Sequence, residues 1–389
     1  MRVLIFFITL LTLTLGCSSE SDSMSGGGED IGIKDSLSTE PNASEHPLHK
    51  LNLPKGFKIS VFGEVENARS LAISPSGVVY VGNRNGGKVY ALKDSDANGV
   101  ADEKYLLASG LKMPNGVAFK DGALYVAEVS KIWKFDNIER QLKAPDKPKL
   151  IYDEYPTESH HGWKYIAFGP DGKLYVPVGA PCNICKSEQP VFASITRMNA
   201  DGTNMEIVAE GVRNTVGFDW NPNTRELWFT DNGRDHMGDN YPPCELNRLQ
   251  TDGQHFGYPY CHGGDIADPE FGAQRPCSDF ERPVWNFGAH TAPLGMKFYR
   301  GDMFPTEYNG DVLVAQHGSW NRSKKVGYRV MRVHIEGNRA TSAEVFIDGW
   351  LEDIGQDQWG RPVDILEMPD GSILLSDDYA GLVYRITYN

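Results

Sequence analysis

The stretch "IAFGPDGKLYVPVG" (residues 166–179) contains the pattern on which the fold depends. Its PDG tripeptide is typical of a tight turn, and the residues that follow alternate as in a half-buried β-strand. Radial repetition of antiparallel strands makes a β-propeller, so a recurrence of this pattern predicts a six-bladed, all-β propeller. The pattern of strands and turns recurs at 71–92, 116–135, 216–233, 295–318 and 363–388.

The ends of the chain and its longest interval between units refine this prediction. A β-sandwich is the alternative fold, but it would need fewer and more regularly spaced strands. The lone strand "FKISVFGEV" (57–65) should complete the sixth blade beside residues 382–388, so that the two ends close the ring. The interval 234–290 is rich in Gly, Pro, Cys and His, which predicts long functional loops on one face of the ring.

The overall charge excludes some classes of partner. The chain has 389 residues and a formal net charge of −14. Nucleic acid and anionic membrane surfaces both repel such a protein, so we expect no nucleic-acid partner.

The N-terminus predicts export and lipidation. Residues 1–16 have a positive start and a short apolar core that ends in Gly16–Cys17, which resembles a bacterial lipobox. We expect a lipoprotein signal peptide, lipid on Cys17 and, because Ser18 gives no inner-membrane retention signal, an outer-membrane location facing the periplasm. The lipid anchor would then be the only contact with a membrane. An ordinary signal peptide with an incidental cysteine is the alternative.

The next segment predicts a flexible link to the folded domain. Residues 17–50 are polar, acidic and rich in Gly and Ser, and they cannot bury enough apolar surface to offset the entropy of ordering. We therefore expect a tether over 17–50 and a propeller domain over 51–389.

The cysteines fit a protein of the cell envelope. Five cysteines follow Cys17, so at most two disulfides can form within the chain. The preferred pairs are Cys261–Cys277 and Cys182–Cys185, which leaves Cys244 free. Zinc is a weaker interpretation of the CxxC because no second close pair follows it, and Lys186 after Cys185 excludes covalent haem attachment.

Two polar motifs stand at the entrances of predicted strands. His160 and His161 precede the quoted hairpin, where a neutral imidazole could accept a proton from a substrate hydroxyl. Arg213 and Asn214, in "VRNTVG" (212–217), offer donors for carboxylates or a carbonyl oxygen. Taken alone, a histidine pair is more often a surface pair with local hydrogen bonds, and an Arg–Asn dipeptide is too common to indicate a site.

Further candidate ligand groups are cationic or acidic. Arg322, Lys324, Lys325 and Arg361, if they converged, would suit a small polyanionic ligand; solvated loop charge is the alternative. The segment 231–247 carries the oxygen ligands that Ca²⁺ prefers. A second candidate Ca²⁺ loop, or else a polar turn, has the spacing of Asp94, Asp96, Asn98 and Asp102.

Taken together, these motifs resemble the pyrroloquinoline-quinone (PQQ) glucose/sorbosone dehydrogenase family over residues 51–389. The segments that carry the resemblance are "HHGWKYIAFGPDGKLYV", "GVRNTVGFDW", "FGYPYCHGG", "HGSWNRS" and "GRPVDILEMPDGSILLSDD". The PDG hairpins are unspecific, whereas the ordered set of His, Arg-Asn, acidic loop and Arg-Pro-Val-Asp is specific.

The resemblance implies roles for individual residues. His161, and not His160, falls at the position of the catalytic base, and Arg213 would stabilise charge on the cofactor. The implied cofactor contacts come from Arg213, Asn214, His290 and Arg361, to which the cationic segment adds Arg322 and Lys324. The backbone of Gly233 and Arg234 and the side chain of Glu245 match the calcium loop. Arg234 stands where relatives often have Pro and Cys244 where they commonly have Asp, and both differences bear on the metal chemistry.

The resemblance therefore implies a PQQ- and Ca²⁺-dependent oxidoreductase that oxidises an aldose or sugar aldehyde. Electrons would leave to an external acceptor such as a cytochrome c, since the chain has no haem motif. One rival is a gluconolactonase-like calcium hydrolase, which would need a central metal held by acidic side chains from several blades. The other rival is a sugar- or protein-binding propeller without catalysis.

Overall fold

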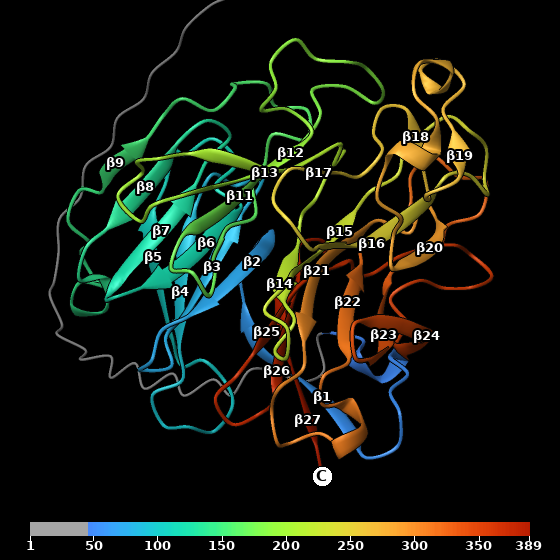
Figure 1. The fold of residues 1–389 in the computed structure, drawn as a ribbon. Helices are drawn as coiled ribbons and strands as arrows, with labels where there is room; N and C mark the ends of the chain where they lie inside the picture. The colour runs from blue at the N-terminus through green and yellow to red at the C-terminus, as the bar shows by residue number, and fades with distance from the viewer. Residues whose placement is uncertain (1–45) are drawn as a thin grey trace, which may run out of the picture. The chain divides into compact units, whose positions relative to one another are not determined.

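The computed structural model describes residues 46–389, which contain 27 β-strands and five short 3-10 helices (Figure 1). All but two of the strands form six sheets that are arranged as the blades of a propeller; the other two form a separate two-stranded sheet. This arrangement confirms the six-bladed all-β fold predicted from the repeated turns.

The first three blades follow one another along the chain. Blade 1 comprises β2 (Ala68–Ile73), β3 (Val79–Asn83), β4 (Val89–Lys93) and β5 (Glu103–Ala108). Blade 2 comprises β6 (Gly116–Lys120), β7 (Ala123–Ala127), β8 (Ile132–Phe135) and β9 (Lys149–Tyr152). Blade 3 comprises β10 (Ala167–Phe168), β11 (Leu174–Val178), β12 (Ser194–Met198), β13 (Glu206–Glu210) and, in parallel at its edge, β17 (Gln254–His255).

The last three blades complete the ring. Blade 4 comprises β14 (Phe218–Trp220), β15 (Leu227–Asp231), β16 (Pro243–Leu249) and β20 (Trp285–Ala289). Blade 5 comprises β21 (Pro293–Phe298), β22 (Val312–Gln316), β23 (Arg329–Glu336) and β24 (Arg339–Ile347). Blade 6 comprises β25 (Pro362–Glu367), β26 (Ile373–Asp377), β27 (Leu382–Tyr388) and β1 (Phe57–Glu64).

The ring closes through the two ends of the described chain. β1 pairs antiparallel with β27, from Phe57 opposite Tyr388 to Glu64 opposite Leu382. The ring of Phe57 also packs against Phe304 and Phe346, with centroids 4.8 and 4.9 Å away. This pairing confirms the predicted closure, and it protects two strand edges that would otherwise be exposed.

The hydrophobic core is divided among the interfaces between neighbouring blades. One buried cluster lies between each successive pair of blades, and a sixth lies between blades 6 and 1. Because both faces of each inner strand are covered, strands such as β3, β7 and β26 are buried along their whole length.

The polar segments singled out from the sequence lie mostly at one end of the ring. In an antiparallel hairpin the first strand begins where the second strand ends, as Ala68 opposite Asn83 and Pro362 opposite Asp377 illustrate. Residues that precede the first strand or follow the second strand of every blade therefore meet at this end, which we call the site face.

The long interval before blade 5 forms a separate small feature. It contains the hairpin of β18 (Cys261–His262) and β19 (Ile266–Ala267) and the helices η3 (Gly272–Gln274) and η4 (Cys277–Asp279). Disulfides join Cys261 to Cys277 and Cys182 to Cys185, and Cys244 is free and buried. All three statements confirm the predictions made from the cysteine spacing.

The signal peptide, Cys17 and most of the predicted tether lie outside the described residues. The described chain begins before residue 51: η1 (Leu48–Lys50) is ordered, and Leu48 packs against the cluster between blades 5 and 6. The two remaining helices are η2 (Ile138–Arg140) and η5 (Thr306–Tyr308). Among residues 46–389, no helix is long and apolar enough to cross a membrane.

Candidate functional site

His161 lies on the site face, in the loop that leads into β10. Its side chain is buried, with 8% of the residue exposed, and its Nδ1 is 2.9 Å from the carbonyl oxygen of Ala180. A carbonyl can only accept, so Nδ1 carries the proton and Nε2 keeps a free lone pair. Burial, followed by the positive charge of Arg213, lowers the pKa of His161 well below its usual value. The imidazole is therefore neutral at physiological pH and able to accept a proton.

His160 differs from its neighbour although the two rings are 4.0 Å apart. Its residue is exposed, and no hydrogen bond within the described chain fixes its ring. The structure thus supports the assignment of the base to His161, which is held in one tautomer and orientation.

Arg213 is the most extensively bonded member of the site. The guanidinium donates from Nε and Nη2 to the backbone and side-chain oxygens of Asn183, and from Nη1 to the carbonyl of Asn232. Its backbone N–H donates to Asp231, which also accepts from the N–H of Asn214 at 2.6 Å. Arg213 is 4% exposed, so these contacts fix a buried cation in position.

Three more arginines approach the axis from blades 1 and 6. Arg361 donates from Nε and Nη2 to the carbonyls of His317 and Gly318, and its guanidinium forms no ion pair in the described chain; its backbone N–H donates to Asp377 at 2.9 Å. Arg69 and Arg84 were not identified from the sequence. We call Arg69, Arg84 and Arg361 the cationic centre.

Arg69 and Arg84 are held by different means. Arg69 is 1% exposed and donates to the Oδ2 of Asp378 at 2.8 Å. The guanidinium of Arg84 lies 3.8 Å from the ring centroid of Trp163, which in turn stands 6.0 Å from the ring of His161. Burial, followed by the charge of Arg69, lowers the pKa of Arg84 to about 10. Like charges thus stand close together in this centre.

One feature of the sequence could have identified Arg84 as a site residue. Arg84 follows the second strand of blade 1, and Asp378 follows the second strand of blade 6. Asn232 occupies the same place in blade 4, directly after Asp231 at the end of β15. Superimposing the six units would have shown that this position contributes polar side chains to the site face.

A small cavity is lined by Arg213 and by Asp231, Asn232, Gly233 and Glu245, and we call these last four residues the metal pocket. Of the predicted calcium ligands, Gly233 and Glu245 line the cavity and Arg234 does not. Burial, and then the charge of Asp231, raises the pKa of Glu245 to about 8. Burial also raises the pKa of Asp231 to about 6.

The oxygens around the metal pocket suit a hard cation. The Oδ1 atoms of Asn214, Asn232 and Asn247 are buried and have no hydrogen-bond partner within residues 46–389. Glu245 accepts hydrogen bonds from Gly263 N–H and the Asn247 amide, but it forms no ion pair in the described chain. Carboxylate and amide oxygens are the donor set that Ca²⁺ prefers.

Arg234 and Cys244 both leave this donor set intact. The guanidinium of Arg234 binds Asp268 at 2.6 Å and Glu270 at 3.1 Å, so its charge is paired outside the pocket. Cys244 packs in the core between blades 4 and 5, and burial raises the pKa of its thiol. The position therefore adds no charge to the metal pocket.

The other predicted cofactor contacts do not all lie at the same place. His290 lies 3.7 Å from Asp235, which itself lies 3.5 Å from Arg213, so His290 borders the site. Arg322 donates to the carbonyl of Asp239 in the loop that His290 also contacts. Lys324, however, does not converge with Arg361.

The position of Lys324 follows from the anchoring of its loop. It lines a separate cavity with Lys325, Arg322 and Arg329 beside blade 5, and neither Arg361 nor His161 borders that cavity. Lys325 is held there by Gln356 and Gln358, which directs the segment away from the axis.

The second candidate calcium loop lies at the opposite end of blade 1 from the site face. It joins the end of β4 to the start of β5, and Asp94 and Asp96 both accept a hydrogen bond from the N–H of Asn98. Asp102 accepts from the N–H of Ser95. A cation there could only support the fold.

The fold and this site define a class: six-bladed propellers with a cationic, histidine-bearing centre at one end of the ring. The chain belongs to the family described as a domain of unknown function, DUF7133, whose model matches residues 47–385. An uncharacterised protein of Borreliella burgdorferi is 33% identical over 361 residues, covering 89% of this chain and 93% of its own.

Solved structures extend the likeness of the fold. A calcium structure of a Trichoderma reesei protein of the carbohydrate-active enzyme family AA12 has a TM-score of 0.77 at 20% identity, covering 87% of this chain and 97% of that one. The holo pyranose dehydrogenase PQQ domain of Coprinopsis cinerea has a TM-score of 0.74 at 18% identity, with the same coverages. The resemblance in fold to PQQ-dependent sugar dehydrogenases is thereby confirmed.

Proposed function

We propose that the protein is a PQQ- and Ca²⁺-dependent dehydrogenase of an aldose or sugar aldehyde. The observation that carries the proposal is the cationic centre beside a neutral, oriented His161. The guanidinium groups of Arg361 and Arg84 form no ion pair with a carboxylate within the described chain, so a polycarboxylate ligand would complete them.

The chain's own residues would divide the work as follows. Nε2 of His161 accepts the proton of the sugar hydroxyl, while Nδ1 stays bonded to Ala180 and keeps the ring in place. Arg361 and Arg84 bind carboxylates, and Arg213 presents fixed positive charge where negative charge develops. Glu245 and the neighbouring amide oxygens hold Ca²⁺. PQQ bound among these groups would supply the acceptor for the hydride that leaves the sugar.

The rival functions predict different centres. A gluconolactonase-like hydrolase needs acidic side chains from several blades around one metal, whereas guanidinium groups from blades 1, 4 and 6 occupy this site face. The metal pocket lies to one side, within blade 4 and its loops. These observations favour the dehydrogenase.

Reconstitution tests the proposal directly. Purified protein is incubated with PQQ and Ca²⁺, and reduction of an artificial electron-accepting dye is followed with a panel of aldoses. Dye reduction that requires PQQ, Ca²⁺ and sugar together is expected. Lactone hydrolysis with Ca²⁺ alone would favour the hydrolase, and sugar binding without either reaction would favour a binding propeller.

We further propose that electrons pass to an external carrier such as a cytochrome c, and that lipid on Cys17 anchors the protein to the outer membrane facing the periplasm. Both proposals rest on the sequence. Cys17→Ser should move the protein into the soluble periplasmic fraction, and unchanged membrane association would contradict the anchor.

A further inference from the structure

The loop between β11 and β12 carries the disulfide Cys182–Cys185 on the site face. Both cysteines are half-buried, and we call residues 182–185 the disulfide loop. The bond spans three positions of the sequence, whereas Cys261–Cys277 spans 16. Because the entropic gain of a disulfide grows with the loop that it closes, the shorter bond restricts the unfolded chain less. We therefore expect its main effect on the local structure between the two cysteines.

Asn183, which lies between the two cysteines, holds the guanidinium of Arg213. Its carbonyl oxygen accepts from Nε and its Oδ1 accepts from Nη2, each at 2.9 Å. The third hydrogen bond of this guanidinium in the described chain goes to the carbonyl of Asn232. Two of the three bonds that orient Arg213 thus end on one residue of the disulfide loop.

The same asparagine also holds the segment that follows β15. Its Oδ1 accepts from the N–H of Asp235 at 2.8 Å, and its Nδ2 donates to the carbonyl of Asp235 at 3.1 Å. The carboxylate of Asp235 lies 3.5 Å from Nη2 of Arg213, farther than the two oxygens of Asn183. Asn183 therefore offers neutral acceptors to Arg213, whereas a closer approach to Asp235 would pair the cation with a carboxylate.

A buried tyrosine supports the disulfide loop from below. Tyr258 is 4% exposed, and its hydroxyl accepts from the N–H of Cys185 at 3.0 Å and lies 3.4 Å from Sγ of Cys182. The covalent bond and this hydroxyl fix the residues on both sides of Asn183. The asparagine consequently has little freedom to leave Arg213.

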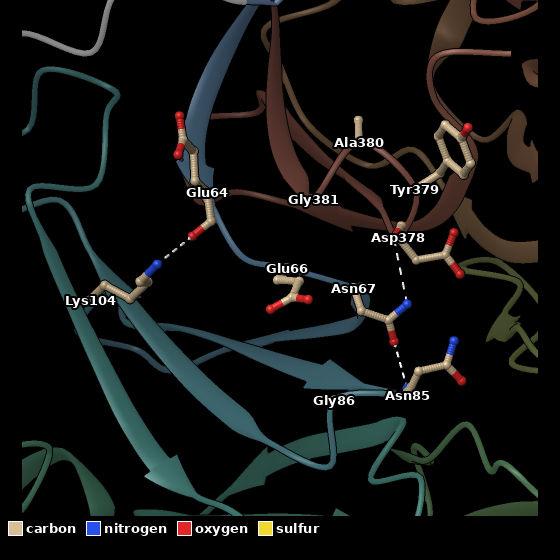
Figure 2. Close-up of a pocket in the computed structure, with 10 residues that line it drawn as sticks. All are labelled: Glu64, Glu66, Asn67, Asn85, Gly86, Lys104, Asp378, Tyr379, Ala380 and Gly381. Atoms are coloured by element: carbon tan, nitrogen blue, oxygen red, sulfur yellow. Dashed lines mark hydrogen bonds between the residues drawn. The ribbon is translucent and has the colours of Figure 1, made fainter. Parts of the chain in front are cut away.

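A second asparagine on the site face joins two loops without a disulfide. Asn67 donates to the carbonyl of Asp378 and accepts from the N–H groups of Arg84 and Asn85 (Figure 2). All of these partners are backbone groups. Joining two loops therefore needs no disulfide, and what distinguishes Asn183 is that it also fixes a charged side chain.

We propose that Asn183 is a positioning residue for Arg213 and that the disulfide Cys182–Cys185 keeps it in place. This inference rests on the proposed function, in which Arg213 presents positive charge where negative charge develops. Reduction by a dithiol converts Cys182 and Cys185 to thiols; the dithiol supplies two electrons and two protons and itself becomes a disulfide. The freed loop then lets Arg213 leave Asn183, so that turnover falls while sugar affinity is retained.

Kinetics of the PQQ- and Ca²⁺-loaded protein give the first test. Asn183→Ala keeps the disulfide, and it should lower kcat by about 10- to 100-fold with a sugar KM within about twofold, as expected for a displaced charge-stabilising group. Cys182→Ser combined with Cys185→Ser should show the same split. Wild-type protein that is reduced with dithiothreitol, blocked at its thiols and freed of reductant before PQQ is added should also lose turnover. The same treatment should cause no further loss in the double variant, which separates this disulfide from Cys261–Cys277.

Labelling of Arg213 gives a readout that needs neither PQQ nor turnover. The full chain is treated with phenylglyoxal, which modifies accessible guanidinium groups, and each arginine is followed by peptide mass spectrometry. Modification of Arg213 should become about tenfold faster in Asn183→Ala and in the reduced protein, the scale of one lost hydrogen bond to a charged group. Arg69, which is 1% exposed, should stay slow. Asn67→Ala removes the other asparagine and should leave the labelling of Arg213 unchanged.

The outcomes separate the possible failures. Faster labelling of Arg213 in Asn183→Ala, in a protein without dehydrogenase activity, would overturn the proposed function but support the positioning role. An active enzyme in which Asn183→Ala changes neither kcat nor this labelling would overturn the positioning role alone, as would equal acceleration at Arg69 and Arg213. Labelling that accelerates in Asn183→Ala but not on reduction would overturn the role of the disulfide.

Discussion

The cationic centre and the metal pocket are two buried regions of opposite charge on the same face of the ring. In the cationic centre, the guanidinium of Arg361 donates to two carbonyl oxygens and that of Arg84 lies against an aromatic ring. In the metal pocket, Glu245 has a raised pKa and its neighbours are unpartnered amide oxygens. Each region alone is costly because a buried charge without a partner is poorly solvated.

Arg213 is the residue that joins the two regions. Its backbone binds Asp231 and its guanidinium binds Asn232, both in the metal pocket, while its charge lowers the pKa of His161. Because the regions differ in charge, the ligand that would suit both has carboxylates at one end and metal-binding oxygens at the other. The experiments below test whether the two regions act separately.

The largest effect should come from His161, which belongs to neither region. His161→Ala should lower turnover by about 10²–10⁴-fold and leave PQQ affinity unchanged, because a general base acts on the substrate proton. Turnover is measured at saturating PQQ and Ca²⁺, and PQQ affinity by titration. His160→Ala is the matched control and should remain active. An inactive His160→Ala with an active His161→Ala would transfer the role to the neighbouring histidine.

Arg361→Ala should weaken PQQ binding by roughly 10- to 100-fold, the range expected for losing charge-assisted hydrogen bonds. Turnover at saturating PQQ should fall far less, because a carboxylate contact acts mainly on the bound cofactor. Fluorescence titration with PQQ measures the change. Lys324→Ala, on the same face but in another cavity, is the control and should bind PQQ normally. Equal losses in both variants would show that the two cavities act as one.

Calcium binding should depend on pH through the metal pocket alone. Since the pKa of Glu245 is raised to about 8, Ca²⁺ must displace a proton below that pH, and its affinity should fall by up to about tenfold per unit as pH drops from 8 to 6. Calorimetric Ca²⁺ titrations at several pH values measure this slope, and Glu245→Gln should abolish it. A flat profile would show that Glu245 does not bind the ion.

The Glu245 carboxyl also determines how the stability of the calcium-free protein changes with pH. The native carboxyl keeps its proton up to about pH 8, whereas the unfolded carboxyl loses it near its ordinary pKa of about 4.3. Between these values the native state binds more protons, so its stability falls as pH rises. Added Ca²⁺ should therefore raise the melting temperature more at pH 8.5 than at pH 6.

The fold was predictable because its signals are local. Each PDG-type turn and the alternation that follows it depend on neighbouring residues only, as in the strand after Asp171–Gly172. The closure of the ring could also be inferred, since β1 has no other unit to join. His161, Arg213 and Glu245 could be proposed as site residues because their motifs occur in a specific order along the chain.

The rest of the site depends on contacts between distant segments. Arg69 and Asp378 form an ion pair across 309 positions of the sequence, and nothing near either residue indicates the other. The cavity that Lys324 lines could not be predicted for the same reason, because its loop is held by Gln356 and Asp239 through contacts that the local charge pattern does not contain. Local sequence thus predicts elements better than it predicts which side chains meet.

The smallest effect should come from changing the loop at the opposite end of blade 1. This change distinguishes calcium bound in the metal pocket from calcium bound elsewhere. Asp94, Asp96 and Asn98 lie between β4 and β5, away from the site face. Asp94→Asn with Asp96→Asn should leave turnover and PQQ affinity unchanged. If this loop binds Ca²⁺, the variant should lose one bound ion per chain and a few degrees of melting temperature, because an exposed site contributes to stability only through its own occupancy. Calcium stoichiometry measured by atomic emission decides between these outcomes. A loss of activity would mean that the calcium needed for turnover lies in this loop, and the comparison between a cationic centre and a metal pocket would then have to be abandoned.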